Sequence, residues 1–284
     1  MSSLMSTAPR AAPPVAQALD AHIDGVGLLG PGLSDWAQAQ AVLRGDVPYD
    51  AQKTVLPMPQ ILPAAERRRA TAVIKLTLAS GLEAVAHAGL NPADLATVFT
   101  SSSGDGRNCH EICAALAGSD RLLSPTRFHN SVHNAASGYW GIATGAMAPS
   151  AVLCAFDASF AAGLLEALVQ VALLRQPMLL LAYDTDYPEP LHHVRPIPDS
   201  FGVALVLAPQ AGARSLARLS LDPTAPFTEL PADTLNDAAL EALRLAIPAA
   251  RALPLLRALA RREAARIVLD DLPGQQLALQ LTPC

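Results

Sequence analysis

The chain has 284 residues, of which 51% are hydrophobic and only 16% carry a charged side chain. Its 20 basic residues stand against 25 acidic ones, which gives a formal net charge of −5. This acidic balance offers no electrostatic surface for nucleic acid, and no run of Lys and Arg is long enough to supply one locally. The length suffices for one or two domains with a full hydrophobic core.

The first 19 residues are rich in Ser, Ala and Pro and show no periodic pattern, which predicts a mobile, disordered tail. They contain no apolar core of signal-peptide length. Later apolar stretches are interrupted by Gly, Pro, Arg or Asp before they reach the length of a membrane span. We therefore expect a cytoplasmic protein without a membrane span. Four cysteines do not form a disulfide framework for a chain of this size.

The first predicted elements lie between residues 22 and 100. A short apolar run at residues 22–29, closed by a Gly-Pro-Gly turn, predicts a strand, and Ser34 is expected to cap the helix that follows. Residues 47–63 are rich in proline and predict a loop. Apolar residues recur at helical spacing over residues 64–90, which predicts one long helix, and residues 95–100 predict a buried strand.

The middle of the chain alternates between predicted strands and helices. After a loop of small residues at 101–106, helices are predicted at residues 108–116, 134–146 and 158–174, and buried strands at residues 151–155, 178–182 and 201–207. This alternation predicts an α/β fold whose sheet is mixed and mostly parallel, has about five strands and carries helices on both faces.

The pattern weakens after residue 209. Residues 237–245 predict a helix, a helical or irregular segment continues to about residue 262, and two short apolar runs follow at residues 266–269 and 276–281.

The helix predicted at residues 158–174 is apolar on nearly every side. Its interior carries only Glu166 and Gln170 as polar residues, so all of its faces must be buried. A single sheet covers one face of such a helix. We therefore expect either the C-terminal segment or a second protein to cover the rest.

One stretch of the sequence resembles the β-ketoacyl synthases. It runs from Ser124-Pro125 through Asn134 and Gly138 to Pro149-Ser150. In that family a Ser-Pro start, an Asn-x-x-x-Gly pair and a Gly-Pro-Ser turn lead into a strand that ends at the nucleophilic cysteine. The resemblance covers roughly residues 20–208. It implies the N-terminal half of a thiolase-type fold at residues 20–209, with a divergent C-terminal extension at residues 210–284.

The resemblance also shows which catalytic groups of the family are missing. Asp157 occupies the position of the nucleophilic cysteine, and a carboxylate there is a poor acyl acceptor, although a helix N-terminus would stabilise its charge. Cys154 lies three residues earlier, so a nucleophilic role for it would require a shifted elbow. The family's Gly-Thr-x-x-x-His segment and Gly-Phe-Gly-Gly loop occur nowhere in the sequence, and His192 and His193 lie outside any matching motif.

These departures resemble the chain-length-factor subunits of type II polyketide systems, and most of all their short class from aryl polyene pathways. Such subunits lack the cysteine and pair with an active, full-length ketosynthase. The resemblance implies a non-catalytic subunit without a cofactor, which shapes the acyl tunnel during polyketide, aryl polyene or fatty-acid-like chain elongation and meets acyl carrier protein through the complex. The implied tunnel and partner interface comprises His129, His133, Asn134, Gly138, Tyr139, Trp140, Phe156 and Asp157.

Two other functions remain open for the same residues. The first is a stand-alone hydrolase or decarboxylase of acyl thioesters, in which Ser159 is the nucleophile and His129, His133 and Asp157 supply acid and base groups. The second is a homodimer of the same fold with a purely structural role.

Two further clusters carry a weaker signal. Cys109, His110 and Cys113 have helical spacing, but a structural metal site usually has four ligands and no second pair lies nearby, so we expect no metal. Arg67, Arg68 and Arg69 fit the solvated face of a helix, and an acidic carrier protein is the partner that such a basic patch would suit.

Overall fold

The computed structural model describes residues 18–272 and 274–284, so the predicted tail lies almost wholly outside the described residues. The strands are β1 (Leu19–Leu29), β2 (Ala96–Thr100), β3 (Ser150–Leu153), β4 (Met178–Asp184), β5 (Phe201–Ala208), β6 (Ala217–Leu221), β7 (Phe227–Thr228), β8 (Ala265–Asp270) and β9 (Gln276–Pro283). The α-helices are α1 (Trp36–Arg44), α2 (Ala64–Arg69), α3 (Ala72–Ala88), α4 (Gly106–Ala117), α5 (Pro125–His129), α6 (Ala135–Thr144), α7 (Ser159–Leu174), α8 (Leu191–Val194), α9 (Ala238–Ala246) and α10 (Leu253–Arg261). Short 3₁₀ helices are η1 (Pro92–Asp94), η2 (Phe156–Ala158) and η3 (Pro248–Ala252).

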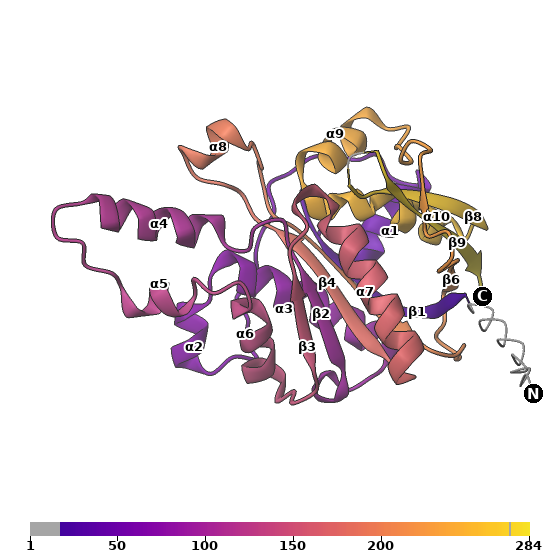
Figure 1. Cartoon of the computed structure of the whole chain (residues 1–284), viewed down its shortest axis with the longest axis horizontal. Coiled ribbons are helices and arrows are strands. Elements are labelled where there is room, and N and C mark those ends of the chain that lie inside the picture. Colours follow the sequence, from indigo (N-terminus) through magenta and orange to yellow (C-terminus); the bar gives the residue numbers. More distant parts are fainter. Residues whose placement is uncertain (1–17, 273) are drawn as a thin grey trace, which may run out of the picture.

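The described strands form one mixed sheet in the order β3-β2-β4-β5-β1-β6-β9-β7, and β8 pairs with β9 (Figure 1). The α/β class is confirmed, but the prediction of a mostly parallel sheet is wrong. In the described part of the chain only β2 with β3 and β2 with β4 are parallel, and the other pairings are antiparallel. The reason is that helical crossovers connect only the early strands. The loop from β4 to β5 holds a single short helix, α8, so β5 returns beside β4 in the opposite direction.

Helices cover both faces of the sheet, as predicted. On one face α3 and α6 pack on the strands through a core that includes Ile74, Trp140 and Leu181. On the other face lie α1, α7, η3 and α10. Helix α3 lies so close to β1 that a Cβ at Gly25 would come within 2.1 Å of the Ala84 carbonyl oxygen. Glycine is therefore required there for the helix to pack directly on the strand.

Two boundaries near the N-terminus differ from the sequence prediction. The segment expected as one helix is divided into α2 and α3, because Ala70 is extended and Thr71 starts the second helix. The cap of α1 is Asp35 rather than Ser34, since the Asp35 carboxylate accepts a hydrogen bond from Gln38 N at 2.8 Å. Ser34 only supports the cap by donating its hydroxyl to the Asp35 carboxylate at 2.9 Å.

Helix α7 is covered on one side by the sheet and in part by η3 from the C-terminal segment. The expectation that the C-terminal segment covers part of this helix is therefore confirmed. Leu173 and Leu174 at the end of the helix remain exposed. By length and composition alone, the segment Phe156–Leu174 would suffice to cross a membrane. Half of its most apolar window is buried inside the fold, which is also typical of a core helix.

Candidate functional site at the elbow between β3 and α7

The elbow that joins β3 to α7 adopts a tight, strained turn. Phe156 has a φ of +52°, in the left-handed region that a bulky side chain rarely adopts. Buried Ser159 closes the turn with its hydroxyl, which accepts a hydrogen bond from Ala155 N at 3.1 Å and donates one to the Phe156 carbonyl oxygen at 2.7 Å. The Ser159 hydroxyl therefore serves the backbone of the turn and is not free as a nucleophile.

Asp157, at the position of the family's nucleophile, is held by two arginines from distant parts of the chain. Its Oδ1 accepts from Arg195 Nη2 at 2.6 Å, and its Oδ2 accepts from Arg251 Nη2 at 3.2 Å. Arg195 directly follows α8, and its guanidinium lies 3.7 Å from the centre of the Phe156 ring. Both carboxylate oxygens of Asp157 are thus engaged by cations.

The ion pairs continue from the elbow into the C-terminal segment. Arg251, in η3, lies 3.6 Å from Asp270 at the end of β8. Asp270 also pairs with the buried Arg244, whose other partner is Glu241 at 2.7 Å. The positive charge of the buried Arg244 guanidinium is compensated because the carboxylates of Glu241 and Asp270 face it. This network fastens α9, η3 and β8 to the N-terminus of α7.

Cys154 does not take over the role of the missing nucleophile. Its thiol donates to the carbonyl oxygen of Ser102 at 2.9 Å, which directs the sulfur to the backbone of the neighbouring loop. In the described part of the chain no hydrogen bond joins His133 to Asp157 or Ser159. The geometry therefore does not support the acid, base and nucleophile set of the hydrolase alternative.

Most of the remaining predicted residues line a second feature, a groove between α5 and α6. It has a volume of about 530 Å³ and is lined by Pro125, Phe128, His129, Val132, Asn134, Ala135, Gly138, Tyr139 and Ile142. The rings of His129 and Tyr139 meet edge to face at 6.4 Å. Gly138 faces open space, since a Cβ there would meet no atom within 4 Å. These lining residues give the groove a largely apolar surface.

Two predicted site residues lie elsewhere. Trp140 is a core residue, packed edge to face on Phe99 at 6.5 Å, and it does not line the groove. His133 belongs to the segment between α5 and α6, and its ring lies beside Gly104 of the loop after β2. Burial lowers the pKa of its imidazole. The eight residues named from the sequence thus divide among the elbow, the groove, the core and this loop.

Asp184, a residue that the sequence analysis did not single out, lies fully buried at the end of β4. Its carboxylate accepts from Ser102 N at 2.9 Å, from the Ser102 hydroxyl at 2.6 Å and from Ala249 N at 2.9 Å. Burial raises its pKa to about 6, although these hydrogen bonds and Arg195 act in the opposite direction. The carboxylate joins the loop at the base of α4 to η3. An acidic residue that ends an otherwise apolar strand was the available sequence signal.

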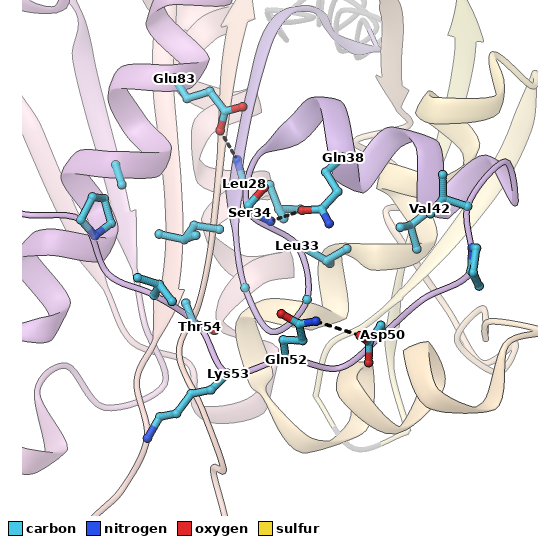
Figure 2. Close-up of a pocket in the computed structure, with 18 residues that line it drawn as sticks. Leu28, Leu33, Ser34, Gln38, Val42, Asp50, Gln52, Lys53, Thr54 and Glu83 are labelled. Carbon is cyan, nitrogen blue, oxygen red and sulfur yellow. Dashed lines mark hydrogen bonds between the residues drawn. The ribbon is translucent and has the colours of Figure 1, made fainter.

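A further pocket of about 690 Å³ lies between β1, α1 and the loop of residues 47–57 (Figure 2). A half-buried acid in its lining is Glu83, which Figure 2 shows directed toward Leu28. The Glu83 carboxylate accepts from Leu28 N at 2.9 Å and from Trp36 N at 2.7 Å, and burial raises its pKa. Because both of its oxygens accept hydrogen bonds from backbone N–H groups, Glu83 orders the turn after β1 and is not itself free to act as a base.

The cysteine and histidine cluster lies on α4, and the arginine cluster lies on α2. Cys109 and Cys113 are exposed on α4, and the partial desolvation of the Cys109 thiol, together with the neighbouring Cys113 thiol, raises the pKa of Cys109. Within residues 18–272 and 274–284, no group of three or more His, Cys, Asp or Glu side chains gathers in a way that would hold a metal ion. Arg69 pairs with Glu66 at 3.0 Å on α2, whereas Arg68 is exposed.

The fold and the elbow define a thiolase-like ketosynthase domain. The family model of the β-ketoacyl synthase N-terminal domain matches residues 34–265, and the chain belongs to this family. The matched range extends well past residue 209. No match was found among curated proteins.

Solved structures with the same fold come from ketosynthase complexes. A chain of the ketosynthase ApeO in complex with its chain length factor ApeC, from Xenorhabdus doucetiae, is 25% identical with a TM-score of 0.68, over 92% of this chain and 98% of that one. A chain of the ishigamide ketosynthase/chain length factor is 16% identical with a TM-score of 0.66, over 93% and 99% of the two chains. A chain of AntDE:AntF, a type II polyketide acyl carrier protein with its ketosynthase, is 12% identical with a TM-score of 0.72, over 94% and 100%. At these lower identities the likeness concerns the fold.

Proposed function

We propose that the chain is a non-catalytic, chain-length-factor-type subunit that pairs with an active ketosynthase during polyketide or aryl polyene chain elongation. One observation carries the proposal. At the elbow where the family places its nucleophilic thiol, this chain has Asp157, and both of its oxygens are bound by the guanidinium groups of Arg195 and Arg251. A carboxylate held in this way does not form an acyl thioester, so the condensing groups come from the partner.

The surface beside the elbow supports a protein partner. Strand β3 is the last strand of the sheet on its side and pairs only with β2 in the described part of the chain, so one of its edges is open. Large apolar side chains stand exposed on the neighbouring elements, among them Phe128 at 66% and Met147 at 94% exposure. Exposed apolar surface next to an open strand edge is typical of an interaction site.

The composition of the complexes with similar structures supports the choice of partner. The ApeO and ApeC complex pairs a ketosynthase with a chain length factor, and the AntDE:AntF complex adds an acyl carrier protein. For this chain we infer a full-length ketosynthase as the direct partner and acyl carrier protein as a partner reached through the complex. Both would meet it in the cytoplasm.

Co-expression of the tagged chain with the full-length ketosynthase from the same genomic neighbourhood tests the proposal. A pull-down followed by mass measurement is expected to give a stoichiometric heteromer, with the isolated chain less soluble than the heteromer. A well-behaved monomer or homodimer that ignores the ketosynthase would overturn the proposal. Turnover of acyl thioesters by the isolated chain would point instead to the stand-alone enzyme.

A further inference from the structure

Phe156 has an unusual conformation for an aromatic residue at the surface. Its φ of +52° lies in the left-handed region, which is sterically unfavourable for an ordinary L-residue. The ring is 60% exposed, so burial in the chain's own core does little to offset this cost. Strained residues of this kind persist where the surroundings fix them, and they gather at functional sites.

Three contacts fix Phe156 in place. The Ser159 hydroxyl accepts its hydrogen bond from Ala155 N and donates to the Phe156 carbonyl oxygen, which closes the turn. The Arg195 guanidinium covers one face of the ring at 3.7 Å. The Asp157 carboxylate accepts a hydrogen bond from that guanidinium at 2.6 Å. Asp157 therefore fixes the position of the Arg195 side chain on the Phe156 ring. The other face of the ring is available for a partner.

We propose that Phe156 is a preorganised aromatic anchor that inserts into an apolar pocket of the ketosynthase, and that Asp157 positions it through Arg195. The proposal rests on the proposed function and adds the residue that dominates the binding energy. Phe156 lies three residues after the end of β3, the strand whose open edge belongs to the partner surface. A rigid aromatic ring gains much affinity on binding because it buries a large apolar area and loses little conformational freedom.

Affinity of the full chain for the ketosynthase, measured by titration calorimetry, tests the anchor. Phe156→Ala is expected to weaken Kd by at least about 30-fold, because truncation of an interface anchor commonly has an effect of this size. Phe156→Gly is expected to weaken Kd equally while its unfolding temperature stays the same or rises, because glycine adopts a positive φ without strain. Simultaneous loss of affinity and gain of stability is a result that a merely structural role would not give.

The matched control is Phe227→Ala. Phe227 is also exposed, at 38%, but it lies on β7 at the opposite end of the strand order from β3. Its replacement is expected to leave Kd unchanged.

The positioning role of Asp157 has its own test. Asp157→Asn keeps the shape of the side chain but removes the charge that holds Arg195, so Kd is expected to weaken by roughly 3- to 10-fold. Asp157→Glu keeps the charge and is expected to recover most of the affinity. In the Phe156→Ala background, Asp157→Asn is expected to have no further effect, because the anchor that it positions is gone.

The outcomes separate the anchor from the proposed function. Unchanged Kd in Phe156→Ala, with the unmodified chain binding tightly, overturns the anchor and leaves the chain-length-factor assignment standing. Unchanged Kd with a changed product length would place Phe156 in the acyl tunnel and also overturn the anchor. Absence of binding by the unmodified chain would overturn both.

Discussion

At the scale of single residues, the elbow shows what replaces a missing nucleophile. Asp157 stands at the N-terminus of α7, where a negative charge is favourable, and it neutralises two arginines brought from α8 and η3. Phe156, immediately before it, carries the strain of the turn. Under the proposed function, the elbow therefore serves as a structural junction rather than as a reactive centre.

The first residue-scale prediction concerns restoration of the thiol. Asp157→Cys is expected to give the isolated chain no condensing activity, because the Gly-Thr-x-x-x-His segment and the Gly-Phe-Gly-Gly loop of the family do not occur in the sequence. Its stability is expected to fall by roughly 1 kcal/mol, since Arg195 and Arg251 lose their shared carboxylate at a partly exposed site. Acyl transfer from acyl carrier protein and urea denaturation measure the two effects. Robust condensation by this variant alone would contradict the assignment.

The second residue-scale prediction concerns the groove. Gly138→Arg is expected to abolish the heteromer without lowering the stability of the isolated chain, because the Cβ faces open space and Arg has a higher helix propensity than Gly. Pull-down and thermal denaturation test this. Ala136, two residues earlier, is buried, so a bulky charge there would disrupt the chain's own core and would not report on the interface. Normal assembly of Gly138→Arg would count against the groove as an interface.

At the scale of elements, the C-terminal segment is tied to the early strands by buried polar contacts. Asp184 at the end of β4 accepts hydrogen bonds from the loop that precedes α4 and from η3. The ion pairs that lead from Asp157 through Arg251, Asp270 and Arg244 to Glu241 form a second connection between the C-terminal segment and the early part of the chain. Displacement of one element would leave charges and backbone groups without partners, so these elements are expected to move together.

The pH dependence of stability tests the junction at Asp184. Its pKa is raised from an ordinary value of 3.8 to about 6, so between these values the folded chain binds more protons than the unfolded chain. Its contribution to stability therefore falls as the pH rises from about 4 to about 6 and then levels off. The difference in free energy of unfolding between the unmodified chain and Asp184→Asn is expected to decline by on the order of 2–3 kcal/mol over this interval. A difference independent of pH would contradict the raised pKa.

At the scale of the whole molecule, the two ends of the sheet differ. The end at β3 is open and flanked by α5, α6 and the elbow, whereas the other end is occupied by β7, β8 and β9 from the C-terminal segment. Figure 1 shows α4 and α5 extending beyond the sheet at one end of the molecule. Helix α4 buries only Gly106 and Asn108 against its own chain. This end of the molecule therefore offers much more surface to a partner than the other.

A double variant tests this asymmetry. Replacement of Phe128 and Met147 by Ser is expected to raise the solubility of the isolated chain and to change its stability by no more than about 0.5 kcal/mol per site, because both side chains are exposed. The same change is expected to weaken the heteromer. Sedimentation and pull-down measure these effects, and Leu230→Ser, at an exposed site away from the β3 edge, serves as control.

The sequence by itself determined the α/β class, the family and most of the helices and strands of the first two hundred residues, because periodicity and short motifs are local properties of the chain. It did not predict the break between α2 and α3 or the short helices α5 and α8. Its resemblance to the family also predicts that Asp157 stands in place of the thiol. The antiparallel return of β5, the addition of β6 to β9 to the same sheet, and the burial of Trp140 in the core were decided only by the tertiary structure. So were the partners of Asp157 and the role of Asp184, since Arg195, Arg251 and Ala249 are brought to them from distant positions by packing that no local pattern encodes.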